Sequence, residues 1–531
     1  MLNPNRRTEL AAFWAAKPPA PQTPNADEAS YPDRRGSFSK GLPHNALGEV
    51  DPSAYNAMVT AVTTKLQSSF NGIPLGGASD PMGRRLTNPQ NGLGVELIGP
   101  DPTHLAIPPA PPFASAEIAA EIVENYWMAI TRDVHFADYG KDALIQQAAT
   151  DLDGLGSLYQ GPRDGSGAVV PQLLFRGTTP GENVGPYVSQ FLLQDCFFGA
   201  QQIDQRMQTV VAGKDYMLDF ATWLEVQRGF GQPKDMTDPT LRYIRNGRDL
   251  GQWVHVDVLY QAYFNAMLIL INGGARLDTG HPYRPGGPIT KEDAFGSLGG
   301  PHLQSLVPEV ARRALRAVWY QKWAVHRRLR PEVFAGRVHL QRTGAKDYGI
   351  NPVVMSGSSV LDQVEAYVEA QTGNSDVYLL PMAFPEGSPI HPAYGAGHAT
   401  VASACVTVLK AWFDTSQNFA ELINPRTGAS LSPVVASADG STRDAYTGPD
   451  AAQITVATEL NKLAANIGLG RNLAGVHWRS DHTESIKLGE AIAIGTLRDY
   501  IGTFNEGWER FYVQKFDGSF VAITGDGEVP Q

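Results

Sequence analysis

The chain has 531 residues and a mass of 57.4 kDa, so it is longer than one ordinary domain and can bury a large core. Its 42% apolar and 18% charged residues are typical of a folded protein and exclude a mainly disordered one. The formal net charge of -11 argues against nucleic acid as the main partner, because phosphate backbones need a basic surface. Two cysteines, Cys196 and Cys405, are too few for a disulfide framework or a cysteine-rich metal site.

The sequence shows no targeting or membrane-spanning segment. Residues 1–7 lack the apolar core of a signal peptide, and the longest apolar runs, such as 266–271, are far too short to span a bilayer. We therefore expect a soluble protein with no membrane partner and, by default, a cytoplasmic location.

Composition divides the chain into three regions. Residues 1–50 are polar and carry four prolines between residues 18 and 24, which predicts an extended N-terminal arm. Helical patterns dominate both of the following regions, 51–300 and 301–531. We expect these two regions to form one intertwined unit, with most of the candidate site in the second.

Several elements can be placed by their boundary signals. A helix is expected over about 115–136, with Ser115 as its N-cap, and two more near 397–413 and 482–502. One short run, 376–384, has a β-like pattern. The sequence therefore predicts a mainly α fold.

Three predicted helices have a stripe of apolar residues that would face the core, and each stripe contains one polar residue. In every stripe, apolar residues recur at alternating steps of three and four. The polar residues are Asp257 within 250–271, Lys322 within 315–329, and His398 at the start of 398–412. A buried charge without a partner costs several kcal/mol, so such residues usually meet one another or a ligand. This pattern favours a polar site inside a helix bundle; the alternative is that Lys322 snorkels and the other two pair with neighbours.

The helix that carries Lys322 should end near Arg330. Arg330 precedes Pro331, and a residue before proline is pushed out of the α region. Its guanidinium would then be free to bind the oxygens of a tetrahedral anion bidentately, beside the compact charge of Lys322. Alone, this pair is also compatible with a solvated helix face.

Gly397 and His398 open a predicted helix. The first amides of a helix have no internal partner and favour an anion, and glycine lets an oxygen approach the backbone closely. His398 could then give or take a proton at that anion. The alternative is a plain glycine-containing helix start.

A third segment carries Arg471, His477 and Asp481. A neutral histidine nitrogen is a competent ligand or nucleophile toward a five-coordinate phosphorus or vanadium centre. Asp481 and Glu484 resemble a capping box for the helix near 482–502, which we take as the main role of Asp481. No histidine or cysteine spacing predicts zinc.

The order of these segments resembles the signature shared by vanadium-dependent haloperoxidases and acid phosphatases of the phosphatidic-acid-phosphatase type. The matching residues are Lys322, Arg330-Pro331, Gly397-His398, Arg471, His477 and Asp481. Stretches 184–193 and 255–266 look like algal and cyanobacterial bromoperoxidases, and the resemblance covers about 180–500. The chain departs from the signature where Pro-Ser is replaced by Gly395-Ala396.

The resemblance implies two four-helix bundles, the second holding a vanadate cofactor. It assigns His477 as the axial vanadium ligand, and it assigns the vanadate oxygens to Lys322, Arg330, Arg471 and the Gly397 amide. His398, oriented by Asp257, would accept the proton of hydrogen peroxide, and Lys322 would polarise the bound peroxide. The enzyme would oxidise a halide to a hypohalous-acid equivalent that halogenates a small organic acceptor.

Two positions bear on the details of that activity. Relatives with histidine at the position of His391 are mostly bromoperoxidases, so we expect bromide and iodide as substrates, with chloride less favoured. Ala396 lacks the serine hydroxyl that usually contacts vanadate, a loss of roughly 1 kcal/mol. This loss should tune vanadate affinity or rate without abolishing either.

The resemblance also implies a large homo-oligomer, with a dodecamer as one form, and a weak calcium site that could use Asp347. Three rival functions stay open. One is a phosphatase with His477 as nucleophile and His398 as acid, and another is a non-catalytic anion-binding protein. The third is a peroxide-independent isomerase or cyclase on the same fold.

Overall fold

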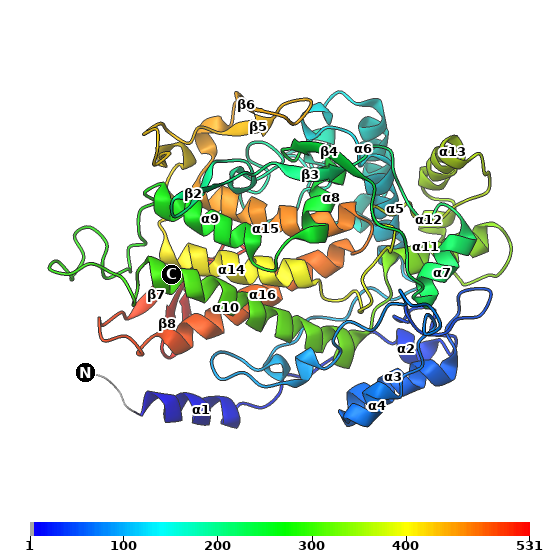
Figure 1. The fold of residues 1–531 in the computed structure, drawn as a ribbon, viewed down its shortest axis with the longest axis horizontal. Helices are drawn as coiled ribbons and strands as arrows, with labels where there is room; N and C mark the ends of the chain where they lie inside the picture. Colours follow the sequence, from blue (N-terminus) through cyan, green and yellow to red (C-terminus); the bar gives the residue numbers. More distant parts are fainter. Residues whose placement is uncertain (1–4, 531) are drawn as a thin grey trace.

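The structure, a computed structural model, describes residues 5–530 and is mainly helical (Figure 1). The helices of the first half are α1 (Arg6–Ala16), α2 (Asp27–Ser30), α3 (Pro52–Thr64), α4 (Gln67–Asn71), α5 (Ala116–Ile130), α6 (Ala143–Gly154), α7 (Phe220–Arg228), α8 (Gly247–Val256) and α9 (Gln261–Asn272). Those of the second half are α10 (Gly300–Tyr320), α11 (Pro331–Arg342), α12 (Pro352–Met355), α13 (Val360–Thr372), α14 (Gly397–Trp412), α15 (Val456–Leu473) and α16 (Arg479–Tyr500).

The strands are short and lie at the periphery of the helical core (Figure 1). They form three antiparallel pairs and one three-stranded sheet. The pairs are β1 (Cys196–Phe198) with β2 (Gln201–Ile203), β3 (Met207–Val210) with β4 (Thr237–Arg242), and β5 (Val434–Ala436) with β6 (Arg443–Ala445). The sheet contains β7 (Arg510–Gln514), β8 (Phe520–Thr524) and β9 (Gly527–Pro530).

Helix α14 lies at the centre of a bundle, packed against α10, α15 and α16 (Figure 1). Every residue of α14 is buried except His398, near its N-terminus. A helix that is apolar on all sides must be enclosed by other elements, which explains its central place. The one partly exposed residue of this helix therefore marks where the core opens to a cavity.

Three predicted helices are confirmed, with adjusted ends. Ser115 caps α5 by accepting a hydrogen bond from the amide of Ile118 (3.3 Å), but the helix ends at Ile130, six residues earlier than expected. The helix predicted over 397–413 is α14. The helix predicted over 482–502 is α16, which begins three residues earlier, at Arg479.

The prediction of one continuous helix stripe over 250–271 is wrong. The chain bends by 98° between α8 and α9, and Asp257 ends α8 with an extended backbone (φ -63°, ψ 150°). Asp257 is thus held in the bend, where its carboxylate can turn away from the helix axis. No single described helix is long and apolar enough to cross a membrane. The bent pair α8 and α9 is long and apolar enough only when its two helices are taken together.

The helix that carries Lys322 ends earlier than predicted. After α10, residues Gln321–His326 form a turn of π-helix, and Arg327 adopts a left-handed backbone (φ 41°). Turns of this kind inside helices are frequent at functional sites. The β-like run 376–384 is also wrong as a strand: Asp376 is exposed with a left-handed backbone (φ 56°), and the buried residues 377–384 form only an isolated bridge between Met382 and Tyr216.

The N-terminal region is only partly an arm. Helix α1 buries none of its residues and lies on the outside of the molecule (Figure 1). Residues 36–44 instead run through the core, where Phe38 and Leu42 are fully buried. The division of the chain at residues 50 and 300 stays a prediction.

Candidate active site

The structure brings the three sequence segments together at one cavity of about 260 Å³. It lies at the N-terminal end of α14, beside the bend between α8 and α9. Its polar lining residues are Asp257, His391, Gly397, His398, Arg471 and His477, and its apolar ones are Leu259, Tyr263, Leu315, Trp319, Pro389 and Val401. Lys322 and Arg330 are fully buried directly behind this lining.

Lys322 lies in the π-turn, and its ammonium group is directed inward. Nζ donates to the carbonyl oxygens of Pro392 (2.7 Å) and Ala393 (2.9 Å), and it lies 5.7 Å from the ring centroid of Trp319. Burial lowers the pKa of Lys322 well below its ordinary value, and the charge of Arg330 lowers it further. Snorkelling toward solvent is therefore excluded for Lys322.

Arg330 is the N-cap residue of α11 and has the extended backbone that the following proline favours. Its guanidinium donates to the carbonyl oxygens of His391 (2.8 Å) and Val476 (2.7 Å). It also reaches two imidazole nitrogens, Nδ1 of His391 (2.9 Å) and Nε2 of His477 (3.0 Å). Burial lowers the pKa of Arg330 to about 9, which shows how unfavourable this environment is for an uncompensated cation.

Arg471 completes the set of buried cations from the last turn of α15. It donates to the carbonyl oxygen of Val254 (2.6 Å), and its guanidinium lies 5.4 Å from the ring centroid of Phe384. Its Nε atom is buried and has no hydrogen-bond partner. Burial lowers the pKa of Arg471 to about 10.

These three cations have no carboxylate within salt-bridge distance among residues 5–530, although Asp481, Asp257 and Glu386 act on them from further away. None of them forms a salt bridge with a described carboxylate; each is held only by carbonyl oxygens, imidazole nitrogens or an aromatic face. Most other buried cations are paired, for example Lys462 with Glu459 (2.6 Å), and the exceptions, Arg337 and Lys410, lie apart from one another and from this cavity. Because unpaired buried charges cost several kcal/mol, this arrangement favours an anionic ligand at the cavity.

His477 is held in one tautomer by its two neighbours. Arg330 can only donate, so Nε2 of His477 must carry the lone pair, and Nδ1–H donates to Oδ2 of Asp481 (2.7 Å). Burial lowers the pKa of His477 well below its ordinary value, and Arg330 and Lys322 act in the same direction. His477 is therefore neutral, with a free electron pair on the nitrogen next to the cations.

Asp481 caps α16 from a different position than the sequence indicated. Trp478 is the N-cap residue of α16, and Asp481 is the third residue of that helix. Its Oδ2 atom accepts from the amide of Trp478 (3.1 Å) as well as from His477, while Glu484 pairs with Lys487 (2.8 Å). The prediction of an Asp481–Glu484 capping box is therefore wrong, because α16 begins before Asp481.

His398 and Asp257 meet at the edge of the cavity. Nε2 of His398 lies 3.0 Å from Oδ1 of Asp257, although the two residues are 141 positions apart. The side chain of His398 is 29% exposed and that of Asp257 is 10% exposed, so the pair is open to the cavity. Asp257 can therefore orient the ring, leaving Nδ1 as the nitrogen that exchanges protons.

The comparisons with known proteins agree with this geometry. Residues 311–505 match the model of the VCPO second helical-bundle domain. The chain is 37% identical to the vanadium-dependent bromoperoxidase of Corallina pilulifera, over 94% of this chain and 93% of that protein. It is 36% identical to the bromoperoxidase of the same kind from Corallina officinalis, over 97% of both chains. The chain belongs to the vanadium-dependent bromoperoxidase family.

A solved structure of the family supports the same fold. The homohexameric structure of the second vanadate-dependent bromoperoxidase from Ascophyllum nodosum superposes with a TM-score of 0.91 at 31% identity. It covers 100% of this chain and 93% of that one. The expected helical-bundle fold is thereby confirmed.

The residues at the cavity fit the oxyanion cofactor that the family name implies. Three buried cations without salt bridges, the unpaired Nε of Arg471 and the lone pair of His477 all suit a vanadate anion. Gly397 is the first residue of α14, so its amide belongs to the four that have no partner inside the helix.

Ala396 is the N-cap residue of α14 and is fully buried. Its methyl group offers no hydrogen bond to the helix or to an anion, and its amide donates to Oγ of Ser485 (2.7 Å). Ser485 does not line the cavity, so it does not replace the missing hydroxyl. Sequence reasoning missed this contact because Ser485 lies on a buried face of α16 without a motif.

His391 lies between Arg330 and the cavity. Its ring packs on Trp319 with centroids 4.6 Å apart, and its Nδ1 accepts from Arg330. Burial lowers the pKa of His391 well below its ordinary value, and Lys322 and Arg330 lower it further. The ring is therefore neutral, and it faces the cavity as a polar wall.

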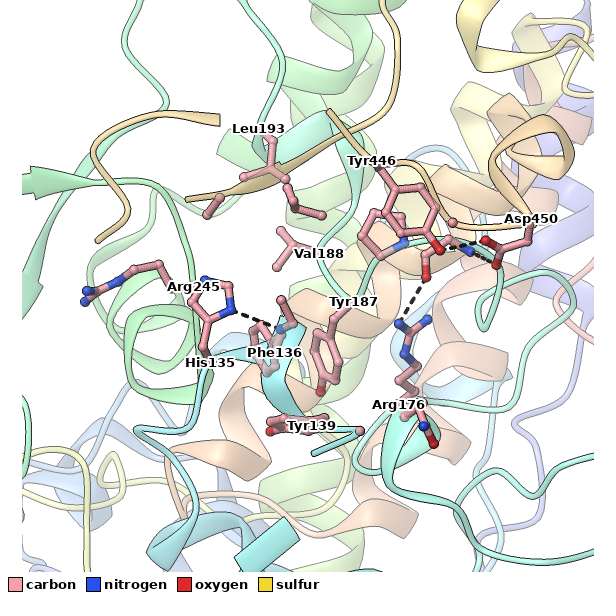
Figure 2. A pocket seen from close by; sticks show the side chains of 18 of the residues that line it. His135, Phe136, Tyr139, Arg176, Tyr187, Val188, Leu193, Arg245, Tyr446 and Asp450 are labelled. Atoms are coloured by element: carbon pink, nitrogen blue, oxygen red, sulfur yellow. Dashed lines mark hydrogen bonds between the residues drawn. The ribbon is translucent and has the colours of Figure 1, made fainter. Parts of the chain in front are cut away.

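A second cavity and the turn that contains Asp347 both lie apart from this cluster of cations and histidines. This larger cavity, about 610 Å³, lies between residues 135–140 and the β5–β6 hairpin and is lined by aromatic residues such as Phe136 and Tyr187 (Figure 2). It includes no predicted site residue. Asp347 lies in an exposed turn, where its carboxylate accepts from the amide of Gly349 (2.8 Å). Within residues 5–530, no group of three or more His, Cys, Asp or Glu side chains is arranged to hold a metal ion.

Proposed function

We propose that this protein is a vanadate-dependent haloperoxidase that oxidises bromide with hydrogen peroxide and delivers a hypohalous-acid equivalent to organic acceptors. The observation that carries the proposal is the set of three buried cations without salt bridges around the lone pair of His477. The family relationship supports the same conclusion, because the relatives named above are bromoperoxidases.

The cationic residues would hold the cofactor in place. Lys322, Arg330 and Arg471 would neutralise the oxygens of vanadate, and the amide of Gly397 would donate to one of them at the start of α14. His477 would provide a nitrogen ligand from Nε2, since Asp481 keeps the proton on Nδ1. When bound, vanadate supplies a Lewis-acidic centre that activates hydrogen peroxide for attack by a halide without a change of oxidation state.

The protein would move protons and exclude water around that centre. His398 would take the proton of hydrogen peroxide at Nδ1, while Asp257 holds Nε2 and stabilises the charged ring. Lys322 would place its positive charge beside the reacting oxygen. The apolar residues Leu315, Trp319 and Val401 would limit water at the site.

Halide preference would depend on His391. Its neutral ring and the indole of Trp319 form one wall of the cavity, which suits a large polarisable halide better than a strongly hydrated one. We therefore expect turnover to be efficient with bromide and iodide and poor with chloride.

Assembly and calcium binding belong to the same proposal. The solved relative is homohexameric, which supports a homo-oligomer here; a dodecamer is the larger alternative, and light scattering on the purified protein would distinguish the two. A structural calcium ion near Asp347 rests only on the family resemblance and the exposed carboxylate. Metal analysis after dialysis, compared with an Asp347→Ala variant, tests it.

One experiment separates the proposed function from its rivals. Apo-protein is mixed with bromide, hydrogen peroxide and monochlorodimedone, with and without orthovanadate, and with excess phosphate as competitor. Vanadate-dependent bromination that phosphate suppresses is expected. Hydrolysis of phosphate esters without bromination would identify a phosphatase that uses His477 as nucleophile. Binding of the anion without either reaction would identify a non-catalytic relative.

A further inference from the structure

The segment around Arg328 supports His477 from behind the cavity. Arg328, Leu329 and Arg330 follow the π-turn in an extended conformation, in which alternate side chains point to the same side. Arg330 contacts Nε2 of His477, and Arg328 contacts Asp481, which contacts Nδ1 of the same ring. Two arginines from one short segment thus hold both nitrogens of His477, one directly and one through a carboxylate.

Arg328 bridges two buried carboxylates. Its Nη1 donates to Oδ1 of Asp481 (2.8 Å) and Oγ of Ser480 (2.8 Å), and its Nη2 donates to Oε2 of Glu121 (2.8 Å). The side chains of Arg328, Asp481 and Glu121 are 1%, 0% and 7% exposed. Burial opposes the charge, but Glu121 and Asp481 raise the pKa of Arg328 above its ordinary value.

Glu121 anchors this bridge to α5. Its second oxygen, Oε1, accepts from the amide of Ser480 (2.6 Å), so the same carboxylate holds both Arg328 and the first turn of α16. Asn125, one turn further along α5, donates to the carbonyl oxygen of His477 (2.9 Å). Helix α5 therefore fixes the backbone of the His477 segment at two points.

We infer that Arg328 is a positioning residue for the cofactor: with Glu121 it holds Asp481 in the orientation that keeps the proton of His477 on Nδ1 and its lone pair on the cavity side. Without Arg328, Asp481 would be a buried carboxylate with one fewer partner and freedom to rotate. His477 could then turn or adopt the other tautomer, which puts a proton on the ligand nitrogen. This inference rests on the proposed role of His477 as vanadium ligand.

Loss of the Arg328 bridge should affect vanadate and phosphate differently. Vanadate would use the lone pair of His477 as well as the three cations, whereas inorganic phosphate would use the cations alone. Loss of the bridge should therefore weaken vanadate binding and spare phosphate binding. Damage to the whole cavity would weaken both anions alike.

The test measures binding of orthovanadate and of inorganic phosphate to the apo-protein by titration calorimetry, in wild type and in Arg328→Gln. We expect a 10–100-fold rise in the Kd for vanadate, the range seen when a residue behind a metal ligand is removed, and less than a twofold change for phosphate. Glu121→Gln should give a smaller rise in the Kd for vanadate. This variant replaces Arg328→Gln as the test if Arg328→Gln does not fold.

Arg479→Gln is the matched control. Arg479 is equally buried, also pairs with a glutamate of α5 (Glu124), and lies near the start of α16, but it touches neither Asp481 nor the His477 ring. It should lose stability without changing the vanadate-to-phosphate affinity ratio. An unchanged ratio in both Arg328→Gln and Glu121→Gln, or an equal shift in Arg479→Gln, would overturn the inference. Failure of the wild type to bind vanadate would instead overturn the proposed function.

Discussion

Nη1 of Arg330 lies 3.0 Å from Nε2 of His477, and both side chains are almost completely buried. A guanidinium cannot accept a hydrogen bond, so this contact requires an electron pair on Nε2. An anion joined to that nitrogen would have its oxygens beside the guanidinium of Arg330. A single contact would therefore place both the proposed ligand atom and the charge that neutralises the anion.

Replacement of His477 by alanine should remove vanadate binding and bromination together. The proposed ligand nitrogen is lost, whereas Lys322, Arg330 and Arg471 remain and should still bind phosphate. The Kd for vanadate should rise to about that for phosphate, and bromination of monochlorodimedone should fall to background. Full activity in this variant would contradict the assignment of His477.

Replacement of Asp257 by alanine should lower kcat for bromination by about 10–100-fold, with little change in vanadate affinity. Asp257 bonds His398 and forms no salt bridge with the three buried cations, although its charge acts on Arg471, so its loss should affect proton transfer much more than cofactor binding. Steady-state kinetics at saturating vanadate, with calorimetric vanadate binding as the second measurement, would test this. A loss of vanadate binding equal to the loss of rate would assign Asp257 to cofactor binding instead.

Three residues that meet at the cavity, Asp257, Lys322 and His398, could be selected from the sequence because each breaks an otherwise apolar pattern. Lys322 and His398 lie within stripes that the structure buries, and the pre-proline position of Arg330 gave its backbone conformation. These are local signals. They depend on burial and steric exclusion, both of which act over a few residues.

The parts that could not be predicted depend on contacts between distant segments. The apolar stripe continues through the bend at Asp257 because both α8 and α9 face the core, and neither glycine nor proline marks the break. The hydrogen bond that uses this bend comes from His398, 141 residues away. Similarly, the local spacing placed Asp481 at the N-cap with Glu484 as its partner, whereas Asp481 is the third residue of α16 and is also held by the distant Arg328.

Replacement of Lys322 by methionine should separate stability from ligand binding. Removal of the buried charge relieves several kcal/mol, but it leaves two carbonyl oxygens without a donor, at about 1–3 kcal/mol each. The two effects nearly cancel, so the free energy of unfolding of the apo-protein should change by about 1 kcal/mol or less. Stabilisation by phosphate, about 2.7 kcal/mol for wild type at 100 times Kd, should be lost at the same phosphate concentration.

Lys462→Met provides the control for that experiment. Lys462 is equally buried but pairs with Glu459, so its removal leaves an unpaired buried carboxylate. This variant should be destabilised by about 3–5 kcal/mol and should still respond to phosphate. Thermal denaturation of Lys322→Met and Lys462→Met, each with and without phosphate, measures the stability of each variant and its stabilisation by phosphate. A Lys322→Met protein that phosphate still stabilises fully would exclude Lys322 from the anion site.

Replacement of Ala396 by serine should have two separate benefits. A serine at the N-cap can accept from an amide in the first turn of α14, which is worth about 1 kcal/mol even without an anion. Its hydroxyl could alternatively donate to a vanadate oxygen, and about 1 kcal/mol corresponds to roughly fivefold tighter binding. Denaturation of the apo-protein measures the first effect, and vanadate titration measures the second. If neither quantity changes, the hydroxyl has no room beside α14.

Acid should destabilise the protein through buried neutral histidines away from the cavity. Burial lowers the pKa of His44 to about 3 and that of His482 to about 3, compared with about 6.5 in the unfolded chain. Between these values the unfolded state binds more protons, so the stability that these residues contribute is complete above pH 6.5. It is lost as pH falls toward 3, by about 1.4 kcal/mol per pH unit for each histidine.

His482→Leu tests that dependence at one position. Nδ1 of His482 is buried without a hydrogen-bond partner, so its removal leaves no donor or acceptor unpaired at that atom. Unfolding by urea at several pH values between 6 and 4 should show a slope reduced by about 1.4 kcal/mol per pH unit relative to wild type. An unchanged slope would mean that His482 is already protonated in the folded protein, because only a group that gains its proton on unfolding contributes to the slope.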